Sequence, residues 1–334
     1  MQHVSWSRSA NIYEVNVRQY TPEGTLNAFA AHLPRLHQMG VDILWFMPIQ
    51  PIGKLKRKGK LGSYYAVADY AAVNPEFGTL KDFKALVQQA HALGMKVIID
   101  WVANHTAWDH VWVKQHPDWY LKNDKGEIHS FQYDNGTEVE DWSDVVGLDY
   151  SQKPLWTAMT QAMQFWVKEA DIDGFRCDVA QLLPLKFWQQ ARAKLDALKP
   201  MFMLAESDNA QLHDQAFDMT YDWALQNVLK KIAKGQADVR DLQAYLVATK
   251  AAYPADAYRT SRPITTPTRG ITTMQPILER PLPPWPCWQR PCPGCPWFTA
   301  VKNLGCTKCC SFLRKTPSTG KLLSTKSCTA RCWP

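Results

Sequence analysis

The feature that most constrains the fold is a regular alternation of strand-like and helix-like segments along the first 258 residues. β-Branched, apolar runs predict strands, and apolar residues at helical spacing predict the helices between them. The predicted strands span 12–20, 41–49, 96–102, 174–180, 201–206 and 218–223. The predicted helices span 25–39, 80–93, 153–169, 185–198, 224–234 and 238–252. Six repeats of strand and helix predict an α/β fold with a parallel sheet.

Two architectures contain such a sheet, and the positions of polar residues distinguish them. Asn104, His105, Asp178 and Glu206 stand where predicted strands end, which is typical of a (β/α)8 barrel. A doubly wound sheet should carry a glycine-rich turn after its first strand, and residues 21–24 (Thr-Pro-Glu-Gly) do not supply one. We therefore predict a (β/α)8 TIM barrel, truncated after about six βα units.

The predicted domain organisation follows from one long interruption and one change in composition. Residues 1–102 form the first part of the barrel with strands one to three, and residues 151–258 form strands four to six with their helices. Residues 103–150 are aromatic and polar without clear periodicity, and a connection of this length is usually functional. They are interpreted as a small, loop-rich inserted domain. Residues 259–334 form an aberrant tail.

The strand Gly174–Ala180 carries an arginine and an aspartate two residues apart. Period-two alternation places Arg176 and Asp178 on one face, and Phe175, Cys177 and Val179 on the other. Taken alone, this segment favours a structural ion pair, although burying such a pair is costly. The polar residues at the ends of the neighbouring predicted strands, His105 and Glu206, favour a catalytic role instead.

Two carboxylates on neighbouring barrel strands can face one another across a small site, as retaining glycosidases require. Asp178 would attack the sugar, and Glu206 would donate a proton to the leaving oxygen. The positive charge of Arg176 would favour the ionised form of Asp178. Partial desolvation at the end of an apolar strand would raise the pKa of Glu206 towards that of a general acid.

Five segments resemble motifs of the α-amylase superfamily of glycoside hydrolases. Ile99–His105 resembles its first motif, Gly174–Asp178 its second, and the strand ending at Glu206 its third. Gly147–Tyr150 resembles the short motif near the end of its inserted domain, and Ser63–Tyr70 the loop whose tyrosine stacks under the reacting sugar. The segments follow the family's order and spacing over about residues 10–258.

The resemblance implies a role for each matching residue. Asp178 would be the nucleophile, Glu206 the acid/base and Arg176 the residue that orients the nucleophile. The substrate-binding residues would be Tyr65, His105 and Asp69.

The resemblance also bears on metal binding. Asn104 matches a position that is often a calcium ligand. Leu182 stands where many calcium-binding members carry a histidine, four residues after the nucleophile, and this argues against calcium. We expect that no cofactor is required.

The composition changes sharply at about residue 259. Residues 259–334 hold 12 of the 38 basic residues, one of the 31 acidic residues, eight of the nine cysteines and 12 of the 22 prolines. The net charge of +7 therefore describes neither part and does not indicate nucleic-acid binding. The spacings Cys292–Cys295 and Cys306–Cys309 match a zinc ribbon, which makes a zinc-binding basic tail one interpretation.

The favoured interpretation of the tail is a frameshift. The family's fourth motif, an Asn-His-Asp that ends the seventh strand, is not present in this reading frame. Permitted codons for Thr260–Thr266, read from the third base, encode Phe-Thr-Ser-Asn-His-Asp. Codons for Pro293–Gly305 in the same frame encode Gly-Met-Pro-Leu-Val-Tyr-Ser-Gly-Gln-Glu-Leu-Gly, which resembles the eighth-strand segment.

If the frame is shifted, the tail is expected to be disordered. Because strands seven and eight and the third catalytic aspartate are missing, the chain is expected to be inactive.

The leading hypothesis is a retaining glycosidase that acts on α-glucosidic bonds of α-glucans or maltooligosaccharides. The alternatives are an α-glucan transglycosidase or isomerase of the same family, or a non-enzymatic product with a zinc-binding tail.

No apolar run reaches about 18 residues and no secretory leader is visible, so we expect no membrane partner and a cytoplasmic location. No nucleic-acid partner is expected, and the oligomeric state stays open.

Overall fold

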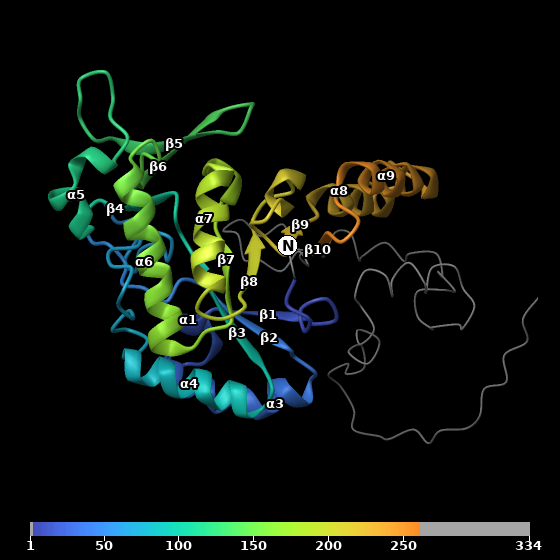
Figure 1. Ribbon diagram of the computed structural model, residues 1–334, viewed down its shortest axis with the longest axis horizontal. Helices are drawn as coiled ribbons and strands as arrows, with labels where there is room; N and C mark the ends of the chain where they lie inside the picture. The colour runs from blue at the N-terminus through green and yellow to red at the C-terminus, as the bar shows by residue number, and fades with distance from the viewer. Residues whose placement is uncertain (1–2, 261–334) are drawn as a thin grey trace, which may run out of the picture.

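The computed structural model describes residues 3–260 and is organised around one seven-stranded parallel sheet (Figure 1). Each pair of neighbouring strands in this sheet is parallel. From one edge of the sheet to the other, the strands are β1 (Ile12–Val15), β2 (Ile43–Phe46), β3 (Lys96–Trp101), β7 (Gly174–Cys177), β8 (Phe202–Ala205), β9 (Met219–Tyr221) and β10 (Tyr258–Thr260).

The sheet curls into an incomplete barrel. Ile12 of β1 and Thr260 of β10 stand at opposite ends of the strand order, yet both line the same cavity. Ile12 and Tyr258 also pack against the same buried cluster. A flat sheet would keep these side chains far apart, so residues 3–260 form a curled half-barrel, as expected for part of the predicted (β/α)8 barrel. Within residues 3–260, β1 and β10 each have one strand neighbour.

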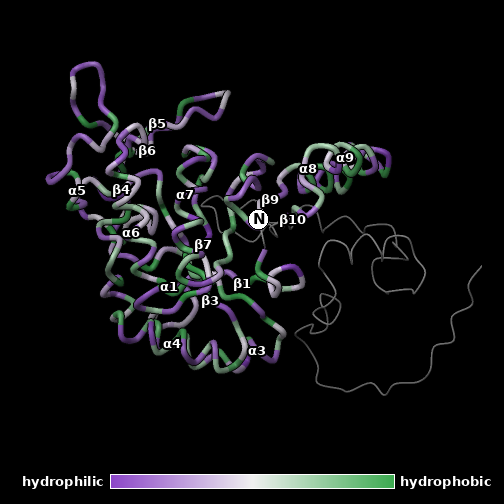
Figure 2. The backbone as a smooth tube through the Cα atoms, viewed as in Figure 1, coloured by the Kyte–Doolittle hydropathy of each residue, from purple (hydrophilic) through white to green (hydrophobic). Residues whose placement is uncertain are grey.

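Alternation along each strand separates the core into an inner and an outer layer. Trp45, Ile98 and Leu204 belong to the inner cluster, whereas Phe175 and Cys177 belong to the larger cluster between the sheet and the helices. In Figure 2, hydrophobic stretches follow the central strands and recur along the helices that cover them. The inward face of the strands is therefore where polar side chains such as Arg176 stand out.

Six helices lie against the outer side of the sheet: α1 (Val17–Tyr20), α2 (Leu26–Ala30), α3 (Leu33–Gln38), α4 (Leu80–Ala92), α6 (Lys153–Ala170) and α7 (Leu185–Asp196). The last two described helices, α8 (Trp223–Ala233) and α9 (Val239–Ala252), pack on each other beside β9 and β10 (Figure 1). The start of α4 shows why the sequence forms a helix there. Thr79 and Asp82 form a reciprocal capping box that satisfies the first backbone N–H groups. Phe83, Leu86 and Val87 then bury one face of the helix.

Two predicted elements are divided in the structure. The segment 12–20, expected to be one strand, forms β1 and then α1, with Asn16 at the helix N-cap. The segment 25–39, expected to be one helix, forms α2 and α3. Pro34 lies in the first turn of α3, where its missing N–H costs nothing, so a new helix begins there.

The sheet contains one strand more than the six predicted. β10 pairs with β9, and the Asp222 N–H donates to the Thr260 carbonyl at 2.9 Å. The boundary placed at residue 258 therefore falls inside this strand, and Arg259 and Thr260 belong to the sheet. Three residues with alternating polarity give too little pattern to predict a strand. The predictions for residues 261–334, including the zinc ribbon and the frameshifted segment, lie outside the described residues.

The segment after β3 forms a second sheet of three antiparallel strands, β4 (His105–Ala107), β6 (Val139–Gly147) and β5 (Ser130–Asp134), in that order. A short helix, α5 (Val111–Gln115), and a 3-10 turn, η1 (Pro117–Trp119), connect β4 to this hairpin. Figure 1 shows the turn between β5 and β6 extending away from the barrel. The insertion expected from the sequence is thus present, but it is built on a sheet.

No helix within residues 3–260 is long and apolar enough to span a membrane. Cys177 is buried and unpaired.

Candidate active site

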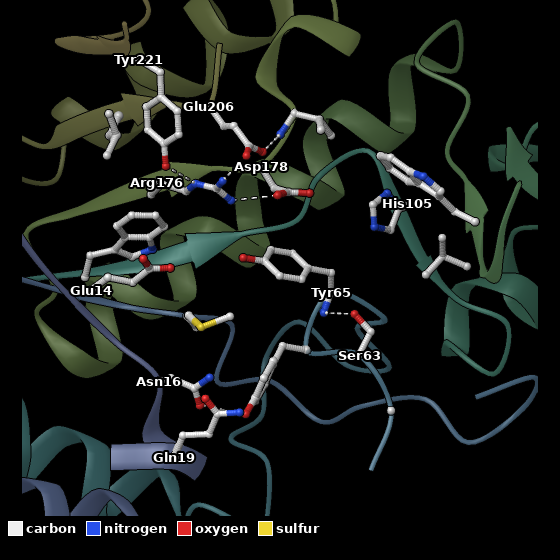
Figure 3. A pocket seen from close by; sticks show the side chains of 18 of the residues that line it. Glu14, Asn16, Gln19, Ser63, Tyr65, His105, Arg176, Asp178, Glu206 and Tyr221 are labelled. Atoms are coloured by element: carbon white, nitrogen blue, oxygen red, sulfur yellow. Dashed lines mark hydrogen bonds and ion pairs between the residues drawn. The ribbon is translucent and has the colours of Figure 1, made fainter. Parts of the chain in front are cut away.

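A cavity of about 1050 Å³ opens at the carboxyl ends of the barrel strands (Figure 3). Its walls come from the sheet, from the loop after β2 and from the inserted sheet. Five of the predicted site residues line it, which are Tyr65, His105, Arg176, Asp178 and Glu206. The chain segments that carry them are far apart in sequence, so the fold brings together residues that were predicted separately.

Arg176 stands at the centre of the site. Its Nη1 atom lies 2.8 Å from Oδ1 of Asp178 and 2.8 Å from Oδ1 of Asp100, and its Nη2 atom lies 2.7 Å from Oε1 of Glu206. Its Nε donates to the Tyr221 hydroxyl at 3.3 Å. One buried guanidinium therefore holds three carboxyl groups from three neighbouring strands, a geometry that suits the fixed fork of arginine donors.

Asp100 is a site residue that sequence reasoning did not single out. It is fully buried on β3, directly opposite Arg176 in the strand register. Its Oδ2 atom accepts hydrogen bonds from the Trp45 indole and the Tyr65 hydroxyl, both at 3.3 Å. Burial raises the pKa of Asp100 to about 6, against the lowering effect of Arg176. A charged residue on the inward face of an otherwise apolar strand was the signal that could have identified it.

The local backbone explains how Asp178 and Glu206 meet. A Cβ atom on Gly174 would lie 2.0 Å from the Phe202 carbonyl oxygen, so glycine allows β7 to lie this close to β8. After Asp178 the chain turns sharply at Val179, whose φ of 38° is strained for a β-branched residue. The turn directs the Val179 N–H to Oε2 of Glu206 at 3.0 Å.

Val179 therefore departs from the predicted alternation. It was expected on the face opposite Asp178, among apolar side chains, but it lines the cavity. The reason is that β7 ends at Cys177, so the period of two does not extend to residue 179.

Burial affects the pKa of Asp178 more strongly than the positive charge of Arg176 does. Burial raises the pKa of Asp178 well above its usual value, and the neighbouring Glu206 and Asp100 carboxyl groups raise it further. Arg176 lowers it, as the sequence suggested, but opposes only part of this effect. Asp178 and Glu206 are held by the two Nη atoms of the same guanidinium. The site thus holds two neighbouring carboxyl groups whose charged forms repel each other, which favours one of them being protonated.

His105 is held neutral at the wall of the cavity. The Asn104 side-chain amide donates to its Nδ1 at 3.2 Å, so the ring proton is on Nε2. Burial lowers the pKa of His105 to about 4. The ring of His105 therefore adds no charge to the wall of the cavity.

Two predicted residues lie elsewhere. Asp69 is exposed, does not line the cavity, and accepts a hydrogen bond from the Ala71 N–H at 2.8 Å in a local turn. Asn104 is buried and directs its amide towards His105. Within residues 3–260, no group of three or more His, Cys, Asp or Glu side chains is arranged to hold a metal ion. The structure therefore gives Asn104 a supporting contact to His105.

The loop after β2 contributes to the cavity, although a basic run of this kind is more typical of a solvated loop. Lys58 lines the cavity and its Nζ lies 3.0 Å from Oδ1 of the buried Asp144 on β6. This ion pair links the loop to the inserted sheet. Contacts between segments so far apart in sequence leave no local pattern that could predict them.

Comparisons with known proteins show the family and the fold. The family model described as "Alpha amylase, catalytic domain" matches residues 6–235. The structure resembles an alpha-amylase from Lactobacillus plantarum, at 40% identity and a TM-score of 0.70, with 75% of this chain and 62% of that chain covered. It also resembles a noncanonic maltogenic alpha-amylase from Thermotoga neapolitana, at 38% identity and a TM-score of 0.69, with coverage of 76% and 58%.

The sequence is also similar to a curated alpha-1,4-glucan:maltose-1-phosphate maltosyltransferase from Rhodospirillum rubrum. The two are 34% identical over 217 residues, which cover 58% of this chain and 31% of the relative. The match thus spans about a third of that protein.

Proposed function

The chain belongs to the family of α-amylase catalytic domains, and we propose that its site cleaves α-glucosidic bonds of α-glucans or maltooligosaccharides with retention of configuration. The observation that carries the proposal is the convergence of Asp178 and Glu206 on Arg176, at 2.8 and 2.7 Å. Because both carboxyl groups bind the same guanidinium, they lie side by side at the site. Carboxyl groups close together are typical of retaining enzymes, whereas inverting enzymes hold a water between theirs.

The proposed reaction proceeds in two steps. The Asp178 carboxylate attacks the anomeric carbon while protonated Glu206 donates its proton to the departing glycosidic oxygen, which leaves a glycosyl ester on Asp178. Glu206 then removes a proton from an incoming hydroxyl group, whose oxygen displaces Asp178 and restores the original configuration. Arg176 keeps both carboxyl groups in position, and the dry surroundings strengthen each of these interactions.

Uncharged side chains around the carboxyl groups would hold the substrate. His105 contributes a neutral ring to the wall, and Tyr65 presents its ring beside the carboxyl groups while its hydroxyl is bound to Asp100. The remaining walls are largely apolar and aromatic, which suits the apolar faces of a pyranose ring.

The incoming hydroxyl decides between hydrolysis and transfer. Water gives hydrolysis, and a sugar hydroxyl gives transglycosylation through the same ester. The similarity to a protein named a maltosyltransferase favours transfer as the second candidate. Product analysis after incubation with maltotriose separates the two, because only transfer yields longer oligosaccharides.

A 5-fluoro-α-glycosyl fluoride tests the proposal directly, since it forms the ester rapidly and releases it slowly. We expect mass spectrometry to find the added glycosyl group on the peptide that contains Asp178. The Asp178→Asn variant should remain unlabelled, whereas Asp69→Asn, outside the cavity, should be labelled like the unchanged chain. A glycosyl group on another residue would contradict the proposal. Because the sequence predicts an inactive 334-residue chain, the same experiment is also run on a chain with the frame restored after Thr260. No labelling of either chain would contradict the proposal as well.

A further inference from the structure

We infer that the β5–β6 hairpin carries an additional sugar-binding surface, which holds glucose units of a neutral α-glucan chain beyond the cavity. We call this surface the hairpin strip and define it as Trp142, Tyr133 and Glu140. The inference rests on the proposed function, because it extends the substrate from the site just described. It concerns binding along the chain of the glucan and assigns no part in bond cleavage.

The register of the hairpin places the strip on one face. Phe131 and Tyr133 are two residues apart on β5, so their side chains point the same way. Phe131 pairs directly with Trp142, and Tyr133 pairs with Glu140. The ring centroids of Tyr133 and Trp142 lie 5.3 Å apart, and those of Phe131 and Trp142 also lie 5.3 Å apart.

The strip begins at the active site. Trp142 lines the cavity, and its ring packs edge-on against His105 with 5.5 Å between the centroids. Tyr133 lies one step further along the hairpin, and it does not line the cavity. A glucan that leaves the cavity past His105 would therefore meet Trp142 first and Tyr133 next. Phe131 lies on the same face and packs between Trp142 and Gly147.

The chemistry of the strip suits a sugar. Trp142 and Tyr133 are half-buried, so part of each ring is available to pack on a pyranose face. The Trp142 indole donates to Oε2 of Glu140 at 3.2 Å, and Glu140 itself is exposed. Aromatic faces next to a fixed carboxylate offer both an apolar platform and an acceptor for hydroxyl groups.

The negative charge of the hairpin favours a neutral ligand over an anionic one. Residues 134–141 include four acidic side chains and no basic ones, namely Asp134, Glu138, Glu140 and Asp141. This local charge would repel a phosphorylated sugar. We therefore assign the strip to an uncharged oligosaccharide of several glucose units.

Binding measurements on the full chain test the inference without requiring turnover. Maltose is short enough to occupy the cavity alone, whereas maltoheptaose extends beyond it. We expect Tyr133→Ala to weaken maltoheptaose binding, measured by calorimetry, by about fivefold, the loss expected for one packed ring. Maltose binding should not change. Tyr133→Phe should bind maltoheptaose within about twofold of the unchanged chain, because it keeps the ring.

Gln132→Ala is the matched control, because Gln132 is exposed on the opposite face of the same strand. It should leave both affinities unchanged. Equal maltoheptaose affinity for Tyr133→Ala and the unchanged chain would overturn the strip, as would an equal loss for both sugars. If the unchanged chain binds neither maltose nor maltoheptaose, the proposed function itself fails, and the strip fails with it. Circular dichroism of each variant confirms that the hairpin variants fold alike.

Discussion

The Nη1 atom of Arg176 lies 2.8 Å from Oδ1 of Asp100, and both side chains are almost completely buried. The pair joins β3 to β7 at a point where each strand is surrounded by apolar residues. Removing one member of a buried pair leaves the other charge uncompensated, which destabilises a protein far more than the pair itself stabilises it.

Arg176→Lys should therefore destabilise the chain severely. Lysine keeps the charge but has no rigid fork, so it cannot reach Asp100, Asp178 and Glu206 together. We expect a loss of about 1–3 kcal/mol in the free energy of unfolding, measured with urea, because the carboxyl groups that lysine cannot reach stay buried without a donor. Arg240→Lys is the control, since Arg240 is 85% exposed and pairs with Asp238 at the surface. Equal stability of the two variants would contradict the central role of Arg176.

Asp178→Asn should abolish labelling and turnover and at the same time stabilise the fold. Burial and two neighbouring carboxyl groups raise the pKa of Asp178, so its charged form is unfavourable in the folded state. An amide of the same shape removes that repulsion, while Arg176 keeps Asp100 and Glu206 as partners. We expect about 1–2 kcal/mol of added stability at neutral pH, measured with urea. A variant less stable than the unchanged chain would refute this account of the site.

Acidification from pH 6.5 to 4 should lower the stability. Burial lowers the pKa of His105, His110 and His213 to about 4, so the folded chain keeps these rings neutral while the unfolded chain protonates them near pH 6.5. The unfolded state then binds more protons, which lowers the free energy of unfolding as the pH falls.

Two carboxyl groups partly offset this pH dependence. The pKa values of Asp100 and Asp178 are raised, so the folded state binds protons at these groups that the unfolded state releases above about pH 4. The three histidines outweigh them. Urea unfolding at pH 7 and pH 5, followed by tryptophan fluorescence, measures the difference. Asp178→Asn should show a steeper loss than the unchanged chain, because one opposing group is removed; a shallower loss would argue against the assignment.

A chain with the frame restored after Thr260 should be far more active. The restored frame would supply Asn-His-Asp, whose aspartate the family resemblance places on the sugar hydroxyls in the transition state. Loss of one such preorganised contact reduces turnover by about 10²- to 10³-fold. We therefore expect at least that gain in kcat/KM on maltooligosaccharides over the 334-residue chain. Equal activity of the two chains, or a nucleotide sequence that offers no such frame, would disprove the frameshift.

Much of the barrel could be predicted because its strands are apolar runs with clear boundaries. Six strands and the convergence of Arg176, Asp178 and Glu206 follow from alternation and from the rule that polar groups gather at strand ends. The weaker predictions concern short elements. β10 has three residues, and α1 has four that include a β-branched valine, so tertiary contacts decide their conformation.

The rest of the site depends on contacts that leave no local trace. The pairing of Lys58 with Asp144 joins residues in two different segments, and only the fold brings them together. Asp69 was assigned to the site by its motif, yet the chain turns there and its carboxylate caps a local backbone N–H. A sequence motif predicts which backbone segment lies near the site. It does not predict the direction of each side chain, which depends on the local backbone turn.

The position of Arg176 has a consequence for how the strands find their alignment. A shift of β7 by one residue would turn Arg176 outward, into the apolar layer that now holds Phe175 and Cys177, and would separate it from Asp100 and Glu206. An uncompensated guanidinium in that layer is costly enough to exclude the shifted pairing. The residues proposed to cleave the sugar therefore also favour the correct strand register during folding. A barrel with mispaired strands would bury the Arg176 guanidinium without its carboxylate partners.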